Sequence, residues 1–192
     1  MKAERRVEKM RMNVPLSLFL LFFFQSCVQN KYLDQDYKSF DQAQKSGWRQ
    51  LAQEGRFKEA AKLIDRYRER NKSLDVSQVV NLLFHAGQLY AFADSYDMVL
   101  ERFKKAKYNP IPDVEPAQMK AFFEEWNVYV DATIAFIRKD RMKLLACRTQ
   151  MANIPNISRG ISNLDVVDSL IRNFDKPYSE AYGAQEKALK KY

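Results

Sequence analysis

The chain has 192 residues, of which 46% are hydrophobic, and its 32 lysines and arginines outnumber its 24 acidic residues, giving a formal net charge of +8. This hydrophobic content is typical of a folded protein and too high for a disordered chain. One histidine, five glycines and two cysteines exclude a histidine-rich metal site, a glycine-rich phosphate-binding loop, a four-cysteine zinc site and a disulfide-rich scaffold. The length suits one domain with its own hydrophobic core.

The N-terminal segment has the pattern of a secretory signal. An apolar run from Val14 to Phe24 follows a stretch rich in basic residues, which are Lys2, Arg5, Arg6, Lys9 and Arg11. A membrane-spanning helix needs about 20 apolar residues, so this shorter run is typical of the core of a signal peptide.

The residues that follow, Phe24-Gln25-Ser26-Cys27, place a small residue directly before a cysteine. This sequence resembles the lipobox of bacterial lipoproteins, and the resemblance implies cleavage before Cys27 and lipidation of its thiol. It further implies a protein anchored by lipid in the cell envelope, with the outer membrane as the expected membrane and the periplasmic or surface side left open. An ordinary signal peptide with a chance cysteine is the alternative. We therefore expect a signal peptide at 1–26, a polar tether at 27–38 and a helical domain at 39–192.

Apolar residues recur with helical spacing through most of the remaining chain. The spacing predicts helices over 40–52, 57–67, 76–93, 96–103, 119–137, 142–152, 164–174 and 178–192. The segment 76–93 is apolar nearly all round, so this helix should lie between neighbours. Three prolines exclude a helix over 108–116. No segment alternates apolar and polar residues for long enough to predict a strand, so we expect an all-α fold.

Three of the predicted turns begin the same pattern. It reads Gly55-x-Phe57-x-x-Ala60-x-x-x-Ile64, Asp94-x-Tyr96-x-x-Val99-x-x-x-Phe103 and Asp140-x-Met142-x-x-Leu145-x-x-x-Thr149. Ala86, Gly87 and Tyr90 precede the second turn, and small residues there allow two helices to approach closely. The arrangement resembles the tetratricopeptide repeat (TPR), which implies antiparallel helix pairs stacked as a short solenoid. The turns are spaced more widely than the roughly 34 residues of a regular repeat, so an irregular helical bundle is the alternative.

The TPR resemblance also implies a function in protein interaction, because the first helix of each pair lines a concave groove in such repeats. Carried over to this sequence, the groove residues are Gln42, Lys45, Arg49, Asn81, Phe84, Gln88, Asn127, Val130 and Ile134. Lys45 and Arg49 would pair with a carboxylate of the partner, and Asn81 and Asn127 would hydrogen-bond an extended peptide backbone. We expect a scaffold or docking module for an envelope protein or peptide, with no nucleic-acid partner.

A second hypothesis is capture of a small ligand or glycan for an uptake system, with Trp48 and Trp126 as stacking surfaces. Packing in the core is the other use of these two side chains, since both lie on apolar helix faces.

Catalysis is not expected. His85 lies within the most apolar helix and Cys147 lies in an amphipathic one, so both are interpreted as packing residues. The sequence predicts no cofactor and no metal.

Basic residues form three clusters, at 66–72, at 104–107 and at 187–191. The first two fall at the ends of predicted helices, where cations interact favourably with the helix dipole. Contact with anionic lipid headgroups near the anchor is the alternative.

Overall fold

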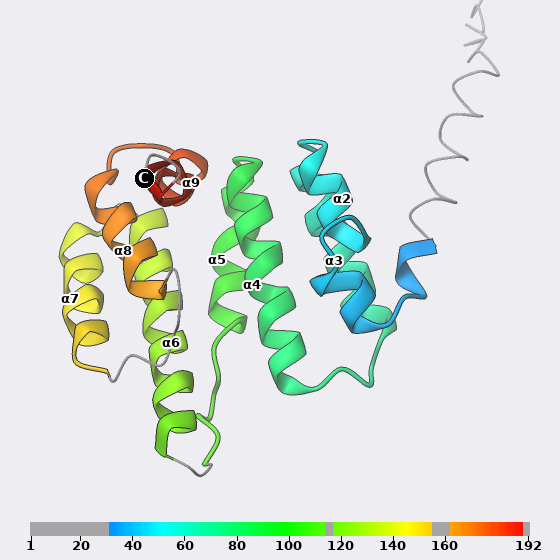
Figure 1. Cartoon of the computed structure of the whole chain (residues 1–192), viewed down its shortest axis with the longest axis horizontal. Coiled ribbons are helices and arrows are strands. Elements are labelled where there is room, and N and C mark those ends of the chain that lie inside the picture. The colour runs from blue at the N-terminus through cyan, green and yellow to red at the C-terminus, as the bar shows by residue number, and fades with distance from the viewer. Residues whose placement is uncertain (1–30, 114–116, 155–161, 190–192) are drawn as a thin grey trace, which may run out of the picture.

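The structure, a computed structural model, describes residues 31–113, 117–154 and 162–189. The residues it describes form helices and no strand, which confirms the predicted all-α class. The elements are a π-helical turn η1 (Lys38–Gln42) and the helices α2 (Gly47–Gln53), α3 (Phe57–Arg70), α4 (Val76–Phe92), α5 (Tyr96–Lys105), α6 (Ala117–Ile137), α7 (Arg141–Ala152), α8 (Asn163–Arg172) and α9 (Tyr178–Leu189) (Figure 1). Within this part of the chain, no helix is long and apolar enough to cross a membrane.

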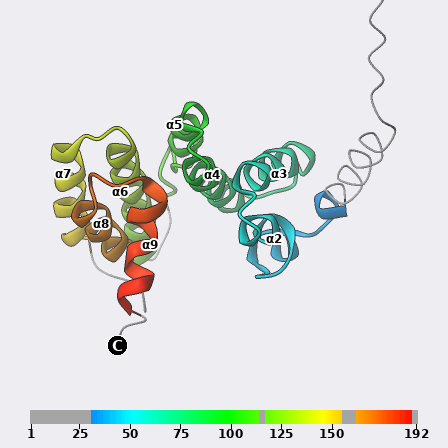
Figure 2. The same cartoon turned by 90° about the horizontal axis from the view of Figure 1, so that it is seen from above.

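Consecutive helices pack as hairpins, in which neighbours from α2 to α8 run roughly antiparallel, whereas α9 lies crosswise to α8 (Figures 1 and 2). The hairpins are α2–α3, α4–α5, α6–α7 and α8–α9, and contacts of α3 with α4 and of α5 with α6 join the first three into a row. Helix α8 packs against both α6 and α7, and α9 turns back against α4. Figure 2 shows two groups of helices, α2–α5 and α6–α9, with α5 next to α6 where they meet.

The single helix predicted over 40–52 is wrong, because the chain breaks into η1 and α2. Gly47, the first residue of α2, has a φ of +54°, a left-handed conformation that favours glycine. A Cβ at this position would lie 2.0 Å from the carbonyl oxygen of Phe40. The ring of Phe40 stacks on the ring of Tyr67 in α3, with centroids 3.7 Å apart. The turn at Gly47 therefore lets both short elements pack against α3.

Helix α4 is the centre of the first group. It starts at a capping box, in which the Asp75 carboxylate accepts from the backbone of Gln78 and the Gln78 side chain accepts from the backbone of Asp75. It packs against α3, α5 and α9, so the prediction that this apolar helix lies between neighbours is confirmed. Gly87 brings α4 close to α5, since a Cβ there would lie 2.7 Å from the Phe103 ring.

Helix α9 joins the two groups through Tyr178, which is buried. The Tyr178 ring contacts Phe92 of α4, Phe103 of α5 and Phe136 of α6, at centroid distances of 5.6, 6.4 and 5.9 Å. Burial and ring contacts of one fully buried aromatic side chain stabilise a folded protein by about 3 kcal/mol. The C-terminal helix is thus part of the core.

The segment predicted as a polar tether, 27–38, is packed against the domain in its described part. Tyr32 and Leu33 are buried, and the Tyr32 hydroxyl donates to Gln50 Oε1 at 2.7 Å. From α3, the Tyr67 hydroxyl donates to the carbonyl oxygen of Gln35 at 2.9 Å. The folded domain therefore includes residues 31–38. The sequence did not indicate this, because the apolar residues of the segment are few and stand among polar ones. The predicted signal peptide and Cys27 lie outside the described residues.

Helix α7 buries a different face from the one that carries the repeat pattern in the sequence. Met142 and Leu145 belong to that pattern, but they are 77% and 38% exposed. The buried residues are Leu144, Cys147 and Met151. Both sets follow helical spacing, so the periodicity of α7 alone does not select a face. Packing against α6 and α8 makes the selection.

Candidate functional site

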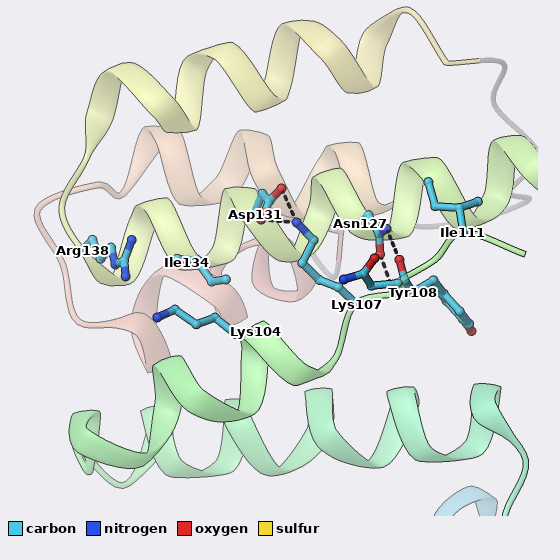
Figure 3. Close-up of a pocket in the computed structure, with 9 residues that line it drawn as sticks. Lys104, Lys107, Tyr108, Ile111, Asn127, Asp131, Ile134 and Arg138 are labelled. Carbon is cyan, nitrogen blue, oxygen red and sulfur yellow. Dashed lines mark hydrogen bonds and ion pairs between the residues drawn. The ribbon is translucent and has the colours of Figure 1, made fainter.

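A cleft of about 600 Å³ lies between α5 and α6 (Figure 3). One wall is the C-terminal end of α5 with the segment that follows it, and the other is one face of α6. The lining residues are Lys104, Lys107, Tyr108, Asn109, Ile111, Asn127, Asp131, Ile134 and Arg138. The four on the α6 side are three or four positions apart, so they share one side of the helix. The volume is in the range of ligand-binding sites.

The segment after α5 is held against α6 by hydrogen bonds that replace ordinary secondary structure. Asn127 Oδ1 accepts from the backbone N–H of Tyr108 at 2.8 Å, and Asn127 Nδ2 donates to the carbonyl oxygen of Tyr108 at 2.9 Å. Trp126 Nε1 donates to the carbonyl oxygen of Ala106 at 2.7 Å. The Tyr108 ring packs on Phe123, with centroids 4.5 Å apart. These contacts fix the wall of the cleft that has no helix of its own.

The cleft carries a surplus of positive charge, since three cations and one carboxylate line it. Lys107 Nζ pairs with both carboxylate oxygens of Asp131, at 2.9 and 2.8 Å. Lys104 and Arg138 are exposed, and their side chains have no hydrogen-bond or ion-pair partner among the described residues. Figure 3 shows these two side chains at the same end of the cleft, next to Ile134. The positive charge is therefore concentrated at that end, while the middle is neutral.

Two of the predicted groove residues, Asn127 and Ile134, lie in this cleft. Asn127 does hydrogen-bond a peptide backbone, but the backbone is that of Tyr108 in the same chain, so the amide is not available to a partner. Ile134 is a buried core residue, and the small part of its side chain that stays exposed contributes apolar surface between the charged groups.

Three other predicted groove residues are covered and do not line an open groove. Val130 is fully buried. The Phe84 ring is buried among Phe103, Trp126 and Tyr129, with centroid distances of 5.1, 5.0 and 5.2 Å.

Gln88, the third, is buried and its Nε2 donates to the hydroxyl of Tyr178 at 3.4 Å. Helix α9 therefore occupies the position beside α4 where the predicted groove would be. The predicted groove is closed because the C-terminal helix α9, with its aromatic side chains, packs back onto α4. This packing buries apolar surface that a partner was expected to cover.

The remaining predicted residues belong to a different region, around Asp41 at the junction of η1, α2 and α4. Gln42 donates to the Asp41 carboxylate, and Arg49 Nε donates to the Asp41 carbonyl oxygen at 2.6 Å. Asn81 hydrogen-bonds the side chain of Tyr37, whose hydroxyl donates to Asp41 at 3.1 Å. These hydrogen bonds hold η1, α2 and α4 together, so the side chains that form them are engaged within the domain. Lys45 is exposed and lies apart from these hydrogen bonds.

Asp41 itself is fully buried and was not singled out in the sequence. Its Oδ1 accepts from Trp48 Nε1 at 2.9 Å and lies 2.8 Å from His85 Nδ1. Burial opposes ionisation of this carboxyl, but the hydrogen bonds with His85 and Trp48 and the charge of Arg49 outweigh it and lower the pKa of Asp41. Burial, together with the nearby Asp41 charge, raises the pKa of Tyr37 to about 12. The Nδ1 atom of His85 is thus engaged by Asp41, and the imidazole ring packs beside the indole of Trp48, with centroids 5.1 Å apart.

The other residues with reactive or stacking side chains are engaged in packing. Cys147 is buried, and burial raises the pKa of its thiol, which disfavours the nucleophilic thiolate. Trp48 is buried and Trp126 is half-buried, and the indole nitrogen of each donates within the chain. Among the described residues, no group of histidine, cysteine, aspartate or glutamate side chains has the geometry of a metal site.

Sequence reasoning missed Asp131 and Arg138, although both share a helix face with Asn127 and Ile134. Their spacing from Asn127 and Ile134, which is three or four residues, was the signal in the sequence that could have placed them on the same helix face. Lys104 and Lys107 were noticed as a basic cluster and interpreted as complementing the end of a helix.

Comparison of the chain with protein-family models, with curated proteins and with solved structures found no match.

Proposed function

We propose that this protein is a lipid-anchored lipoprotein of the cell envelope whose helical domain docks a partner protein and performs no catalysis. The observation that carries the docking function is the cleft between α5 and α6, with its fixed walls and its unpaired cations at one end. A recess of preformed shape with unsatisfied charge is a common form of recognition site, since little ordering is needed on binding. The TPR-like pattern of the sequence favours the same class of function.

The absence of catalysis in this proposal is supported by the surroundings of the two residues with the most reactive side chains. His85 Nδ1 is bound to a buried carboxylate whose other contacts are structural. Cys147 is buried with a raised pKa. Neither residue lines the cleft.

The anchor is tested by metabolic labelling with a clickable fatty acid. Labelling should be lost in Cys27→Ser and retained in Cys147→Ser, because Cys147 is buried within the domain. Undiminished labelling of Cys27→Ser would remove the lipid anchor from the proposal.

Docking is tested by photo-crosslinking in native envelopes. A photoreactive residue replaces Ile111 at the rim of the cleft, and the control replaces Glu69, an exposed residue of α3. We expect one dominant adduct that forms from position 111 and not from position 69. Equal adducts at the two positions, or none at position 111, would contradict docking in the cleft.

A further inference from the structure

The end of the cleft between α5 and α6 has a specific arrangement of charge and apolar surface. Lys104 and Arg138 come from opposite walls and are both free of partners among the described residues, and Ile134 lies beside them (Figure 3). Lys107, the third cation, is neutralised by Asp131 in the middle of the cleft. Two unpaired cations around an apolar side chain match a ligand that carries a negative charge next to an apolar group.

The shape of the site favours a polypeptide over a membrane surface. Only two unpaired cations lie at this end of the recess between two helices, whereas segments that bind anionic bilayers gather about four to eight cations on one surface. A narrow ligand with a carboxylate on a short side chain enters such a recess, and Arg138 offers the planar donors that pair with two carboxylate oxygens.

We propose that the cleft between α5 and α6 binds an acidic segment of the partner, with an aspartate or glutamate carboxylate between Lys104 and Arg138 and an adjacent apolar side chain on Ile134. This inference rests on the proposed docking function and names the chemistry of the partner. Because Lys107 and Asp131 neutralise each other in the middle of the cleft, the carboxylate that is recognised lies at one end of the bound segment.

The test is binding of the full chain to a short fluorescein-labelled peptide in which aspartate alternates with leucine, measured by fluorescence anisotropy. The matched peptide has asparagine in place of aspartate. One charge-assisted contact corresponds to about a tenfold preference for the acidic peptide. The double variant Lys104→Glu with Arg138→Glu should lose that preference. The control variant Lys58→Glu with Lys62→Glu changes the same charge on exposed residues of α3 and should keep it.

Equal binding of the two peptides, no binding of either, or an unchanged preference in the Lys104 and Arg138 variant would overturn the inference. A parallel measurement uses phosphatidylcholine vesicles that contain phosphatidylglycerol. Loss of vesicle binding in the same variant, without loss of peptide binding, would assign the cations to the membrane instead. Circular dichroism should show the parent helix content in both variants, since all four substituted residues are exposed. If the position 111 adduct forms but the peptide preference fails, docking stands and only the acidic ligand is rejected.

Discussion

The ring of Phe103 on α5 lies against Gly87 on α4, so closely that a Cβ on Gly87 would come within 2.7 Å of it. The sequence predicted a close approach of the two helices, because the small residues at 86 and 87 precede the turn between them. Phe103 is fully buried and has little space into which to move.

Replacing Gly87 with alanine should therefore destabilise the protein. We expect a loss of about 1 kcal/mol in the free energy of unfolding, because overpacking outweighs the higher helix propensity of alanine. The control is Gly183→Ala in α9, where nothing lies near the added Cβ and a gain of about 0.5 to 1 kcal/mol is expected. Urea denaturation followed by circular dichroism measures both. Equal effects of the two substitutions would show that α4 and α5 are not packed as described.

Removal of the Tyr178 ring should weaken the packing between the two groups of helices. Tyr178→Ala should cost about 4 kcal/mol, because the ring fills the space between α4, α5 and α6. Tyr178→Phe keeps the ring and loses only the 3.4 Å hydrogen bond from Gln88, so its cost should be about 1 kcal/mol or less. The same denaturation measurement distinguishes them. A small effect of Tyr178→Ala would mean that α9 is not docked on α4.

Two adjacent residues test which face of α7 is buried. Leu144→Ala should cost about 3 kcal/mol, since Leu144 is fully buried. Leu145→Ala should change the free energy of unfolding by about 0.5 kcal/mol or less, because Leu145 is exposed. If Leu145→Ala were the more harmful substitution, the face predicted from the sequence would be the correct one.

The lowered pKa of Asp41 predicts part of the acid sensitivity of the protein. A carboxyl whose pKa is lower in the folded state stabilises that state above its unfolded pKa of about 3.9. This stabilisation decreases as the pH falls through about 3.9 and is lost once the folded carboxyl is protonated. Asp41→Asn should therefore show a weaker loss of stability between neutral pH and pH about 3 than the parent does.

The control for Asp41 is Asp97→Asn, at an exposed residue of α5. Its stability should depend on pH as that of the parent does. Other carboxyls with lowered pKa values, such as Glu59 and Glu101, are present in all three proteins and cancel in the comparison. Parallel pH curves for the parent and Asp41→Asn would contradict the assignment.

Most of the fold was predictable because long helices carry a clear apolar period. The bounds of α3, α4 and α5 agree with the predicted segments within a few residues. The break at Gly47 was not predictable from periodicity, because it depends on the approach of η1 to α3. The face of α7 was not predictable either, because two sets of apolar residues on this helix have the same spacing.

The candidate site was predictable only in part. The TPR resemblance placed Asn127 and Ile134 in a groove, and Lys104 and Lys107 were noticed as part of a basic cluster. Their meeting with Arg138 depends on the packing of α5 against α6, which the sequence does not encode locally. The filling of the predicted groove by α9 depends on a contact between residues 88 and 178, which lie far apart in the chain.

The most direct test of the proposed docking function measures whether docking depends on the charge of the cleft between α5 and α6. The photo-adduct at position 111 is quantified in native envelopes for the parent, for Lys104→Glu with Arg138→Glu, and for Lys58→Glu with Lys62→Glu. We expect the adduct to be lost in the first variant and retained in the second. An adduct of parent yield in the first variant, or equal losses in both, would contradict it.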